Sequence, residues 1–419
     1  MAAFFAQAAG GQIADVERVF ALTVGVENSD NPGRQQGALD PEALTYQSLG
    51  LDISLAREAQ RLQANIDGLL TFYRYNSERF EDQTVGRIEA GINWRVVPSI
   101  FDWDIRDVSG DVRGNPFAPP SPENRERLNE FSTGPDFSIP ISDRNTLSIE
   151  ARQLERTWES SHQLDSRVLF GNVLLSRSLS SSRRIGFGVN SRRVDYDEPT
   201  AAPYDVDSAY LSFSNEGRRS GNRLDAGTTR LDLNQMTQSN PYLDWRWRAR
   251  VASRSNLSMG ASWKFEDSGD QLSRLEGETD DPSTGDVALA NVPIERMRFL
   301  LGYSLERPRS TYSFSTDWSD ETYEGIPDLD RERSRIAVSI IHPLSRAAEL
   351  RFDLSHRREE FPQSGDIARD RELSVGANRR LSESFSLVLR YSYFERDSDT
   401  LVPSTENRFS LSLAWAPIR

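Results

Sequence analysis

Apolar and polar residues alternate with a period of two over most of the chain, from near Val16 to Trp415. The segment 257–265, LSMGASWKF, places Leu, Met, Ala, Trp and Phe on one face and Ser, Gly, Ser and Lys on the other. The same alternation recurs in the segments 62–72, 87–95, 350–355, 385–393 and 409–415. Successive side chains of a strand point to opposite faces, so this pattern predicts β-strands rather than helices. Several strands reach about 10 residues or more, which is enough to cross a bilayer at a tilt.

Connections between the predicted strands alternate between short and long. The short ones are 56–60, 98–100, 142–144, 180–183, 216–222, 252–255, 308–309, 345–347 and 382–383. The long ones are 28–44, 76–83, 109–130, 193–204, 266–292, 319–331, 359–370 and 397–405. Outer-membrane barrels have short periplasmic turns and long extracellular loops. Nine hairpins on short turns, together with the first strand (16–27) and the last strand (408–415), predict 20 strands, with 18 as the alternative count.

The composition of the polar face distinguishes a membrane barrel from a soluble β protein. Arg246, Arg248 and Arg250 alternate with Trp245 and Trp247 on one predicted strand. A barrel of about 20 strands has a lumen too wide for side chains to fill, so its interior should be wet and polar. The apolar face must then meet lipid. The sequence predicts an all-β, transmembrane, antiparallel up-and-down barrel in the cell outer membrane, and a soluble two-sheet or propeller-like protein is the alternative.

Composition agrees with this fold class. Mean hydropathy is −0.60 and only 37% of residues are hydrophobic, without an apolar stretch long enough for a transmembrane helix. A barrel strand exposes apolar side chains to lipid only at every second residue, so low hydropathy does not exclude it. The 20 Phe, 12 Tyr and 8 Trp argue against disorder. The net charge of −14 disfavours nucleic acid as a partner.

The ends of the chain carry two targeting signals. Residues 1–11, MAAFFAQAAGG, contain an A-x-A pattern after a short apolar run, which indicates the remnant of a secretory signal peptide. A flexible apolar N-terminus is the alternative, because the basic n-region is missing. Residues 12–419 are then a single barrel domain. The pattern Phe409, Leu411, Leu413 and Trp415 is typical of the terminal strand that the barrel-assembly machinery recognises, here displaced by four residues.

Charge and aromatic residues are also distributed unevenly. The segment from Glu266 to Asp286 holds eight acidic residues and one arginine. The short turns carry Arg183, Arg184, Arg218, Arg219, Arg254, Arg309, Arg346, Arg379 and Arg380. Solubility of exposed loops explains most of the acidic charge, and divalent cations bridging the loops to anionic lipopolysaccharide are a further function. Aromatic residues near predicted strand ends suggest interface girdles against outer-membrane lipid: Trp94, Trp103, Trp158, Trp245, Trp318, Tyr393 and Trp415.

Signals for catalysis, cofactors and metals are weak. The only histidines are His162, His342 and His356, and no arrangement of Ser, His and Asp in the sequence predicts a nucleophile. We expect no enzyme activity and no cofactor. The pairs Asp328/Asp330 and Asp397/Asp399 could ligate calcium, but they lack the spacing of a dedicated loop, and a solvated turn is the favoured interpretation. Cysteine is absent, which excludes disulfides and thiolate metal sites.

The candidate functional residues are charged side chains predicted to line the lumen. They are Arg87, Glu89, Arg95, Arg246, Arg248, Arg250, Arg351, Asp353, Arg357 and Arg390. Rings of charge along a pore set its ion and solute preference, and arginine offers bidentate contacts to carboxylates or phosphates. The alternative is that these charges only pair into networks that rigidify a wet wall. The long connection 109–130, rich in proline, is long enough to fold into the lumen.

Two segments carry a family resemblance: 101–107, FDWDIRD, and 124–152, NRERLNEFSTGPDFSIPISDRNTLSIEAR. Together with the later segment LVLRYSYFERDSD, they resemble the outer-membrane β-barrel porin family (type 2), which includes barrels associated with exopolysaccharide operons and exosortase systems. The resemblance implies a barrel that serves polysaccharide secretion, with exopolysaccharide or its export proteins as partners. We therefore expect a porin-like channel for exopolysaccharide or anionic solutes. The alternative is a non-conducting structural barrel that docks periplasmic partners or surface polysaccharide.

Overall fold

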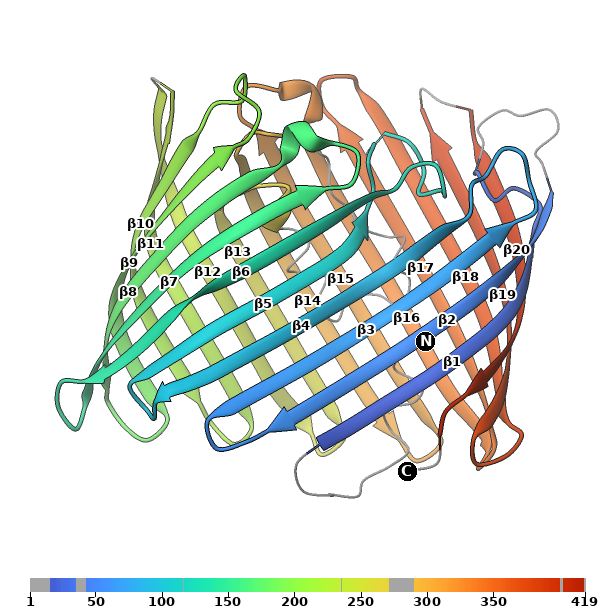
Figure 1. Ribbon diagram of the computed structural model, residues 1–419, viewed down its shortest axis with the longest axis horizontal. Coiled ribbons are helices and arrows are strands. Elements are labelled where there is room, and N and C mark those ends of the chain that lie inside the picture. The colour runs from blue at the N-terminus through green and yellow to red at the C-terminus, as the bar shows by residue number, and fades with distance from the viewer. Residues whose placement is uncertain are drawn as a thin grey trace.

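The computed structural model describes residues 16–34, 43–115, 117–234, 236–270, 290–399 and 402–417. These residues form one closed sheet of 20 antiparallel strands, each paired with the next, with β1 paired to β20 (Figure 1). The strands are β1 (Val16–Ser29), β2 (Leu44–Glu58), β3 (Leu62–Tyr75), β4 (Gln83–Val97), β5 (Phe101–Val112), β6 (Glu126–Pro140), β7 (Asn145–Trp158), β8 (Ser166–Ser178), β9 (Arg183–Tyr196), β10 (Tyr204–Glu216), β11 (Ser220–Leu233), β12 (Met236–Ala252), β13 (Ser255–Glu266), β14 (Ile294–Arg307), β15 (Ser310–Tyr323), β16 (Arg331–Ser345), β17 (Ala348–Phe361), β18 (Asp366–Arg380), β19 (Phe385–Ser398) and β20 (Ser404–Trp415). The predicted fold class and the count of 20 strands are confirmed.

Short turns and long loops lie at opposite ends of the barrel (Figure 1). β1 begins and β20 ends at the short-turn end. In this class of barrel the short turns face the periplasm. Two 3-10 helices, η2 (His162–Leu164) and η5 (Pro327–Leu329), lie in long loops. Within the described residues, no helix has the length and apolar character needed to cross a membrane. The predicted signal remnant, residues 1–11, lies outside the described residues.

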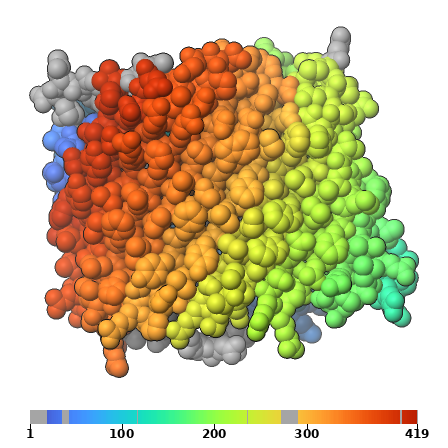
Figure 2. Space-filling view, turned by 180° about the vertical axis from the view of Figure 1, so that it is seen from behind, coloured from blue at the N-terminus to red at the C-terminus, as the bar shows by residue number. Residues whose placement is uncertain are grey.

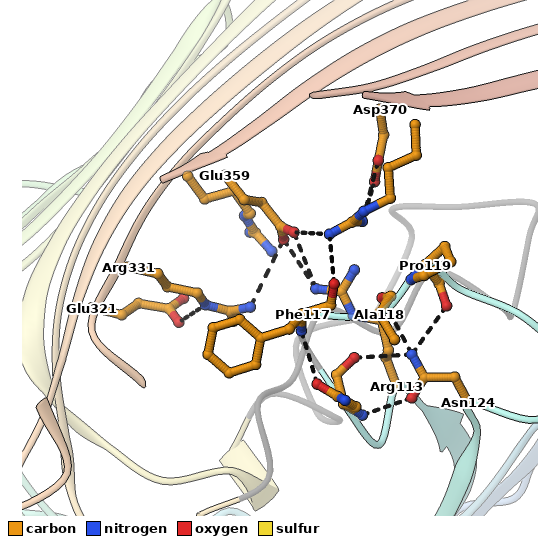
Figure 3. Close-up of polar contacts among 12 residues, drawn as sticks. Arg113, Phe117, Ala118, Pro119, Asn124, Glu321, Arg331, Glu359 and Asp370 are labelled. Carbon is orange, nitrogen blue, oxygen red and sulfur yellow. Dashed lines mark hydrogen bonds and ion pairs between the residues drawn. The ribbon is translucent and has the colours of Figure 1, made fainter. Parts of the chain in front are cut away.

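The outer wall carries the apolar half of the alternation. Side chains such as Leu211, Phe187 and Val189 are exposed there, Leu211 by 67%. The tilt of the strands gives this wall inclined rows of side chains (Figure 2). The polar half points inward, as ion pairs between inner-wall residues and loop residues inside the barrel show (Figure 3). Trp158 is an exception to the predicted girdle: it is 3% exposed, on the inner face, in a cluster with Val108 and Leu128.

Burial of the inner face changes along the barrel axis. On β2, Leu44, Tyr46 and Ser48 at the loop end are buried, whereas the residues at the short-turn end are exposed. Most of the other strands show the same gradient, but β12 has no buried residue, and Ser255, Ser412 and Ala414 are buried near the short-turn end. Among the described residues, four small apolar clusters lie at the loop end instead of one central core. A barrel of this width cannot be filled by wall side chains alone. Loop residues therefore cover the inner wall at the loop end, whereas the described residues leave much of the lumen open toward the short turns.

Gly86, near the start of β4, occupies a backbone conformation that requires glycine. Its φ is +142°, and a Cβ built there would lie 1.9 Å from the carbonyl oxygen of Leu69 on β3. Its N–H donates to the carboxylate of Asp111 on the neighbouring strand β5. At Gly86 the Asp111 carboxylate thus takes the place of a backbone carbonyl as the acceptor.

We expect Gly86→Ala to destabilise the barrel by about 1–3 kcal/mol from backbone strain alone, with the clash against Leu69 adding to this cost. Urea unfolding in detergent micelles measures the change. Gly171→Ala on β8 is the matched control, because the nearest atom to its added Cβ is 4.0 Å away. The control should be neutral or stabilising by up to about 1 kcal/mol. Equal stability of the two variants would contradict the strain argument.

Candidate functional site in the barrel lumen

Residues 113–115 and 117–125, which join β5 to β6, cross the lumen, and we call them the strap. Nη2 of Arg113 lies 3.0 Å from a carboxylate oxygen of Glu359 on β17 (Figure 3). The ring of Phe117 packs on that of Phe361 with centroids 4.4 Å apart, and Arg396 on β19 donates to the Phe117 carbonyl at 3.2 Å. Several strands separate β5 from β17 in both directions around the barrel. The connection 109–130 therefore does fold inward and contacts the far wall.

One side chain holds the strap in shape. The amide nitrogen of Asn124 donates to the carbonyl oxygens of Asn115, Ala118 and Pro119 at 2.9, 3.3 and 3.0 Å. The amide oxygen of Asn124 accepts the backbone N–H of Asn115 at 2.7 Å (Figure 3). Because these bonds join both halves of the strap, Asn124 stabilises the shape in which the strap contacts the far wall. At its outer edge Glu123 pairs with Arg79, an exposed contact of 3.0 Å.

The strap docks on a belt of ion pairs that runs along the inner wall from β12 to β19, which we call the collar. The collar is buried from Glu266 onward, whereas Asp244 and Lys264 at its β12 end are partly exposed and also line an open hollow. Its members, in order of contact, are Asp244, Lys264, Glu266, Arg296, Glu321, Arg331, Glu359, Arg396 and Asp370. The contacts range from 2.7 Å, between Arg331 and Glu321, to 3.9 Å, between Arg396 and Glu359. Arg331 and Glu321 are 0% exposed. A buried charge is costly unless an opposite charge lies beside it, so removal of one member leaves its partner uncompensated.

A second loop segment turns inward on the other side of the lumen. Asp267 and Asp270, which follow β13, both contact Arg192 on β9, and Arg156 on β7 reaches them at 2.7 and 2.9 Å. Burial alone would raise the pKa of Asp270, but the guanidinium groups of Arg192 and Arg156 outweigh it and hold that pKa well below its usual value. The expectation of solvated acids is therefore wrong for these two residues. The acids between 271 and 286 lie outside the described residues.

Toward the short turns the inner wall is open and basic. Two hollows of about 550 and 610 Å³ meet at Gly221, Arg248 and Ser258. Their basic lining, which we call the arginine track, is Arg218, Arg219, Arg223, Arg246, Arg248, Arg250, Lys264 and Arg298, against the acids Glu216, Asp244 and Glu266. The side chain of Arg246 is 77% exposed, although it lies 3.2 Å from Asp244. Cations therefore outnumber anions on a wall that water reaches.

The ten predicted lumen residues share the polar face but form several groups instead of one ring. Arg246, Arg248 and Arg250 belong to the arginine track. Arg351, Asp353 and Arg390 line a third hollow of about 250 Å³, with Arg351 and Asp353 2.9 Å apart. Arg87 and Arg106 both pair with Glu89, at 3.0 and 2.7 Å, and Arg95 reaches the Gln60 carbonyl at 3.5 Å. Arg357 is buried, and its positive charge acts on the nearby carboxylate of Glu359. Contact of these residues with a solute stays a prediction.

The sequence reasoning missed the residues of the strap and most of the collar. Glu359 continues the face of Arg351, Asp353 and Arg357, so the alternation could have found it. Its partner Arg113 lies 246 positions away in a loop without periodicity, and no local signal predicts that contact.

A Ser–His contact also escaped the sequence analysis. Ser310 Oγ lies 2.8 Å from His342 Nδ1, and the same hydroxyl donates to the Arg309 carbonyl at 2.6 Å. With its proton given to a carbonyl, the serine accepts from the histidine, which is the reverse of a nucleophile and its base. The calcium candidates are also engaged: Asp330 accepts the N–H of Tyr323, and Asp399 pairs with Arg369. Among the described residues, no group of three or more potential ligands could hold a metal ion.

No family model and no curated protein matches the sequence. Solved structures do match. A mutant of the ferric enterobactin receptor PfeA of Pseudomonas aeruginosa, in complex with enterobactin, has a TM-score of 0.50 at 9% identity, with 97% of this chain and 82% of that chain covered. The FrpB iron transporter of Neisseria meningitidis has a TM-score of 0.49 at 8% identity, with 96% and 82% covered. At such low identity the likeness shows the fold alone. That fold and the apolar outer wall place the chain in the outer membrane as a β-barrel.

We expect Arg113→Gln to loosen the strap, because Glu359 then loses its 3.0 Å ion pair and keeps longer contacts such as those to Arg331 and Arg396. Loss of a buried partner costs about 3 kcal/mol, equivalent to roughly 100-fold faster hydrogen exchange in the strap. Arg79→Gln is the matched control: it removes an exposed ion pair of the same strap, worth less than about 1 kcal/mol. Equal exchange rates in the two variants would show that the buried pair does not hold the strap.

Proposed function

From an outer-membrane β-barrel with this lumen, we propose a channel that passes anionic solutes between the periplasm and the exterior. The observation that carries the proposal is the arginine track, where exposed guanidinium groups outnumber carboxylates on the open part of the inner wall. Charged groups that line a pore set its ion preference, and guanidinium groups bind carboxylate and phosphate oxygens in pairs. Anions entering from the short-turn end meet Arg218 and Arg219 first, then Arg248 and Arg246.

The strap and the collar supply the narrow part of such a channel. The strap lies across the lumen at the loop end, and Phe117 and Arg113 attach it to the far wall. A wide arginine-lined chamber thus leads to a restricted passage. This order suits a channel that concentrates anions by charge before it selects them by size.

The finer form of the proposal is that the solute is an anionic exopolysaccharide on its way out of the cell. The resemblance of segments 101–107 and 124–152 to the type 2 porin family supports this cargo. The inner wall supports it as well. Gly221, Gly260 and Gly302 line the hollows without side chains, which leaves space between the arginines. A linear polymer with regularly spaced acidic groups could follow such a track.

Charge removal on the track tests the proposal. Arg246→Gln/Arg248→Gln/Arg250→Gln should shift the permeability of single channels in planar bilayers from anions toward cations by several-fold, because these side chains set much of the local potential. Reversal potentials in a salt gradient measure the shift. Arg230→Gln is the control, since Arg230 lies on the outer face and pairs with Asp232.

Two outcomes would contradict the proposal. Folded protein that inserts without conductance would favour the non-conducting structural barrel. Conductance with unchanged selectivity in the triple variant would remove the arginine track from the conduction path.

Release of the strap should widen the passage. We expect Arg113→Gln/Phe117→Ala to raise single-channel conductance, because both contacts that attach the strap to β17 are lost. Arg79→Gln again serves as control and should conduct as the unmodified protein does. A conductance unchanged by the double variant would place the narrowest point elsewhere in the lumen.

A further inference from the structure

Arginines on the outer wall differ between the two ends of the barrel. At the loop end they pair with carboxylates of the same wall: Arg193 with Asp195 at 3.0 Å, Arg230 with Asp232 at 2.9 Å and Arg358 with Glu360 at 2.7 Å. At the short-turn end, Arg177, Arg183, Arg307 and Arg379 have side chains that make no ion pair or hydrogen bond with another residue in the described ranges. These four arginines are the outer rim. Their positive charge is not balanced within the described protein.

The register places Arg177 and Arg183 on the lipid-facing side. Arg177 on β8 is paired with Ile185 on β9, and Ile185 is an exposed residue of the apolar face. The backbone N–H of Leu179 donates to the Arg183 carbonyl at 2.8 Å, which makes Leu179 and Arg183 the next outward pair. Leu179 is 51% exposed. Arg177 and Arg183 are diagonal neighbours, about 7–8 Å apart, so both guanidinium groups can reach one phosphate.

The same combination recurs on two other hairpins. Arg307 at the end of β14 lies on the face of Tyr303 and beside Tyr312 of β15, both exposed to the outside. Arg379 at the end of β18 lies next to Leu381 and Phe385, also exposed. At each hairpin, a guanidinium group and exposed apolar or aromatic side chains lie next to one another near the turn. Arginine in this position extends its charged end to the membrane interface and leaves its stem on apolar surface.

We propose that the outer rim binds anionic phospholipid headgroups of the periplasmic leaflet. The phosphates supply a counter-charge to these four arginines, which form no ion pair within the described residues, and the adjacent apolar residues contact the acyl chains. At the loop end, carboxylates of the same wall already pair with these arginines, so the arginines there need no lipid phosphate as counter-charge. This surface lies on the outside of the barrel and does not depend on whether the lumen conducts.

Lipid competition tests the proposal. The protein is incubated in detergent with equal amounts of phosphatidylglycerol and phosphatidylethanolamine, and retained lipids are counted by native mass spectrometry. We expect a preference for phosphatidylglycerol of about tenfold, because each arginine near an anionic surface adds a favourable interaction. The variant Arg177→Gln/Arg183→Gln/Arg307→Gln/Arg379→Gln should lose this preference. The control Arg193→Gln/Arg230→Gln/Arg358→Gln should keep it.

Equal retention of the two lipids by the unmodified protein, or an unchanged preference in the rim variant, would overturn the proposal. If the rim variant does not fold, ionic strength replaces it as the variable. Raising the salt concentration of the unmodified protein to about 0.5 M shortens the range of exposed charges and should weaken the preference. A preference that does not respond to salt would also overturn the proposal.

Discussion

Lipid offers no hydrogen-bond partners, so every backbone N–H and C=O that crosses the membrane must be satisfied within the protein. This requirement determines the rest of the structure. It closes the sheet through the pairing of β1 with β20 and assigns alternate side chains to lipid and to lumen. With 20 strands the enclosed space is too wide for wall side chains, and the strap and the segment after β13 enter it. Their charged residues are then buried and must be paired, which is why the collar exists.

Arginine illustrates how one residue type acquires different roles from its position. In the collar, Arg331 is fully buried and contacts Glu321 and Glu359, so it stabilises the wall. In the arginine track, Arg246 extends into an open hollow, where its charge is available to a solute. On the outer rim, Arg177 lies among exposed apolar residues, and we assign its counter-charge to the membrane. Distance from the short-turn end and the face of the strand together decide which role applies.

The alternation of residues such as those in 257–265 was sufficient to predict the strands, their faces and, through the lengths of the connections, their number. These features follow from local geometry. The candidate site was predictable only in part. The alternation of odd and even positions along a strand placed Arg246 and Asp353 on the polar face. The contact between Arg113 and Glu359 instead depends on how far neighbouring strands are staggered around the whole barrel. Asp267 and Asp270 were misread because an acidic loop in sequence is the same whether water or Arg156 and Arg192 surround it.

The seam between β1 and β20 is shorter than its neighbours, with eight residue pairs, and it brings together residues that lie almost a full chain length apart. At its loop end, Ser29 donates to Glu406 at 2.8 Å and Asn407 donates to Asp30 at 2.7 Å. Contacts of such high sequence separation cost the most loop-closure entropy and form slowly. The seam is therefore the natural last step of assembly. Until it forms, the strap can reach the inner wall from the side, and once it has formed the interior can be reordered only through the two mouths of the barrel.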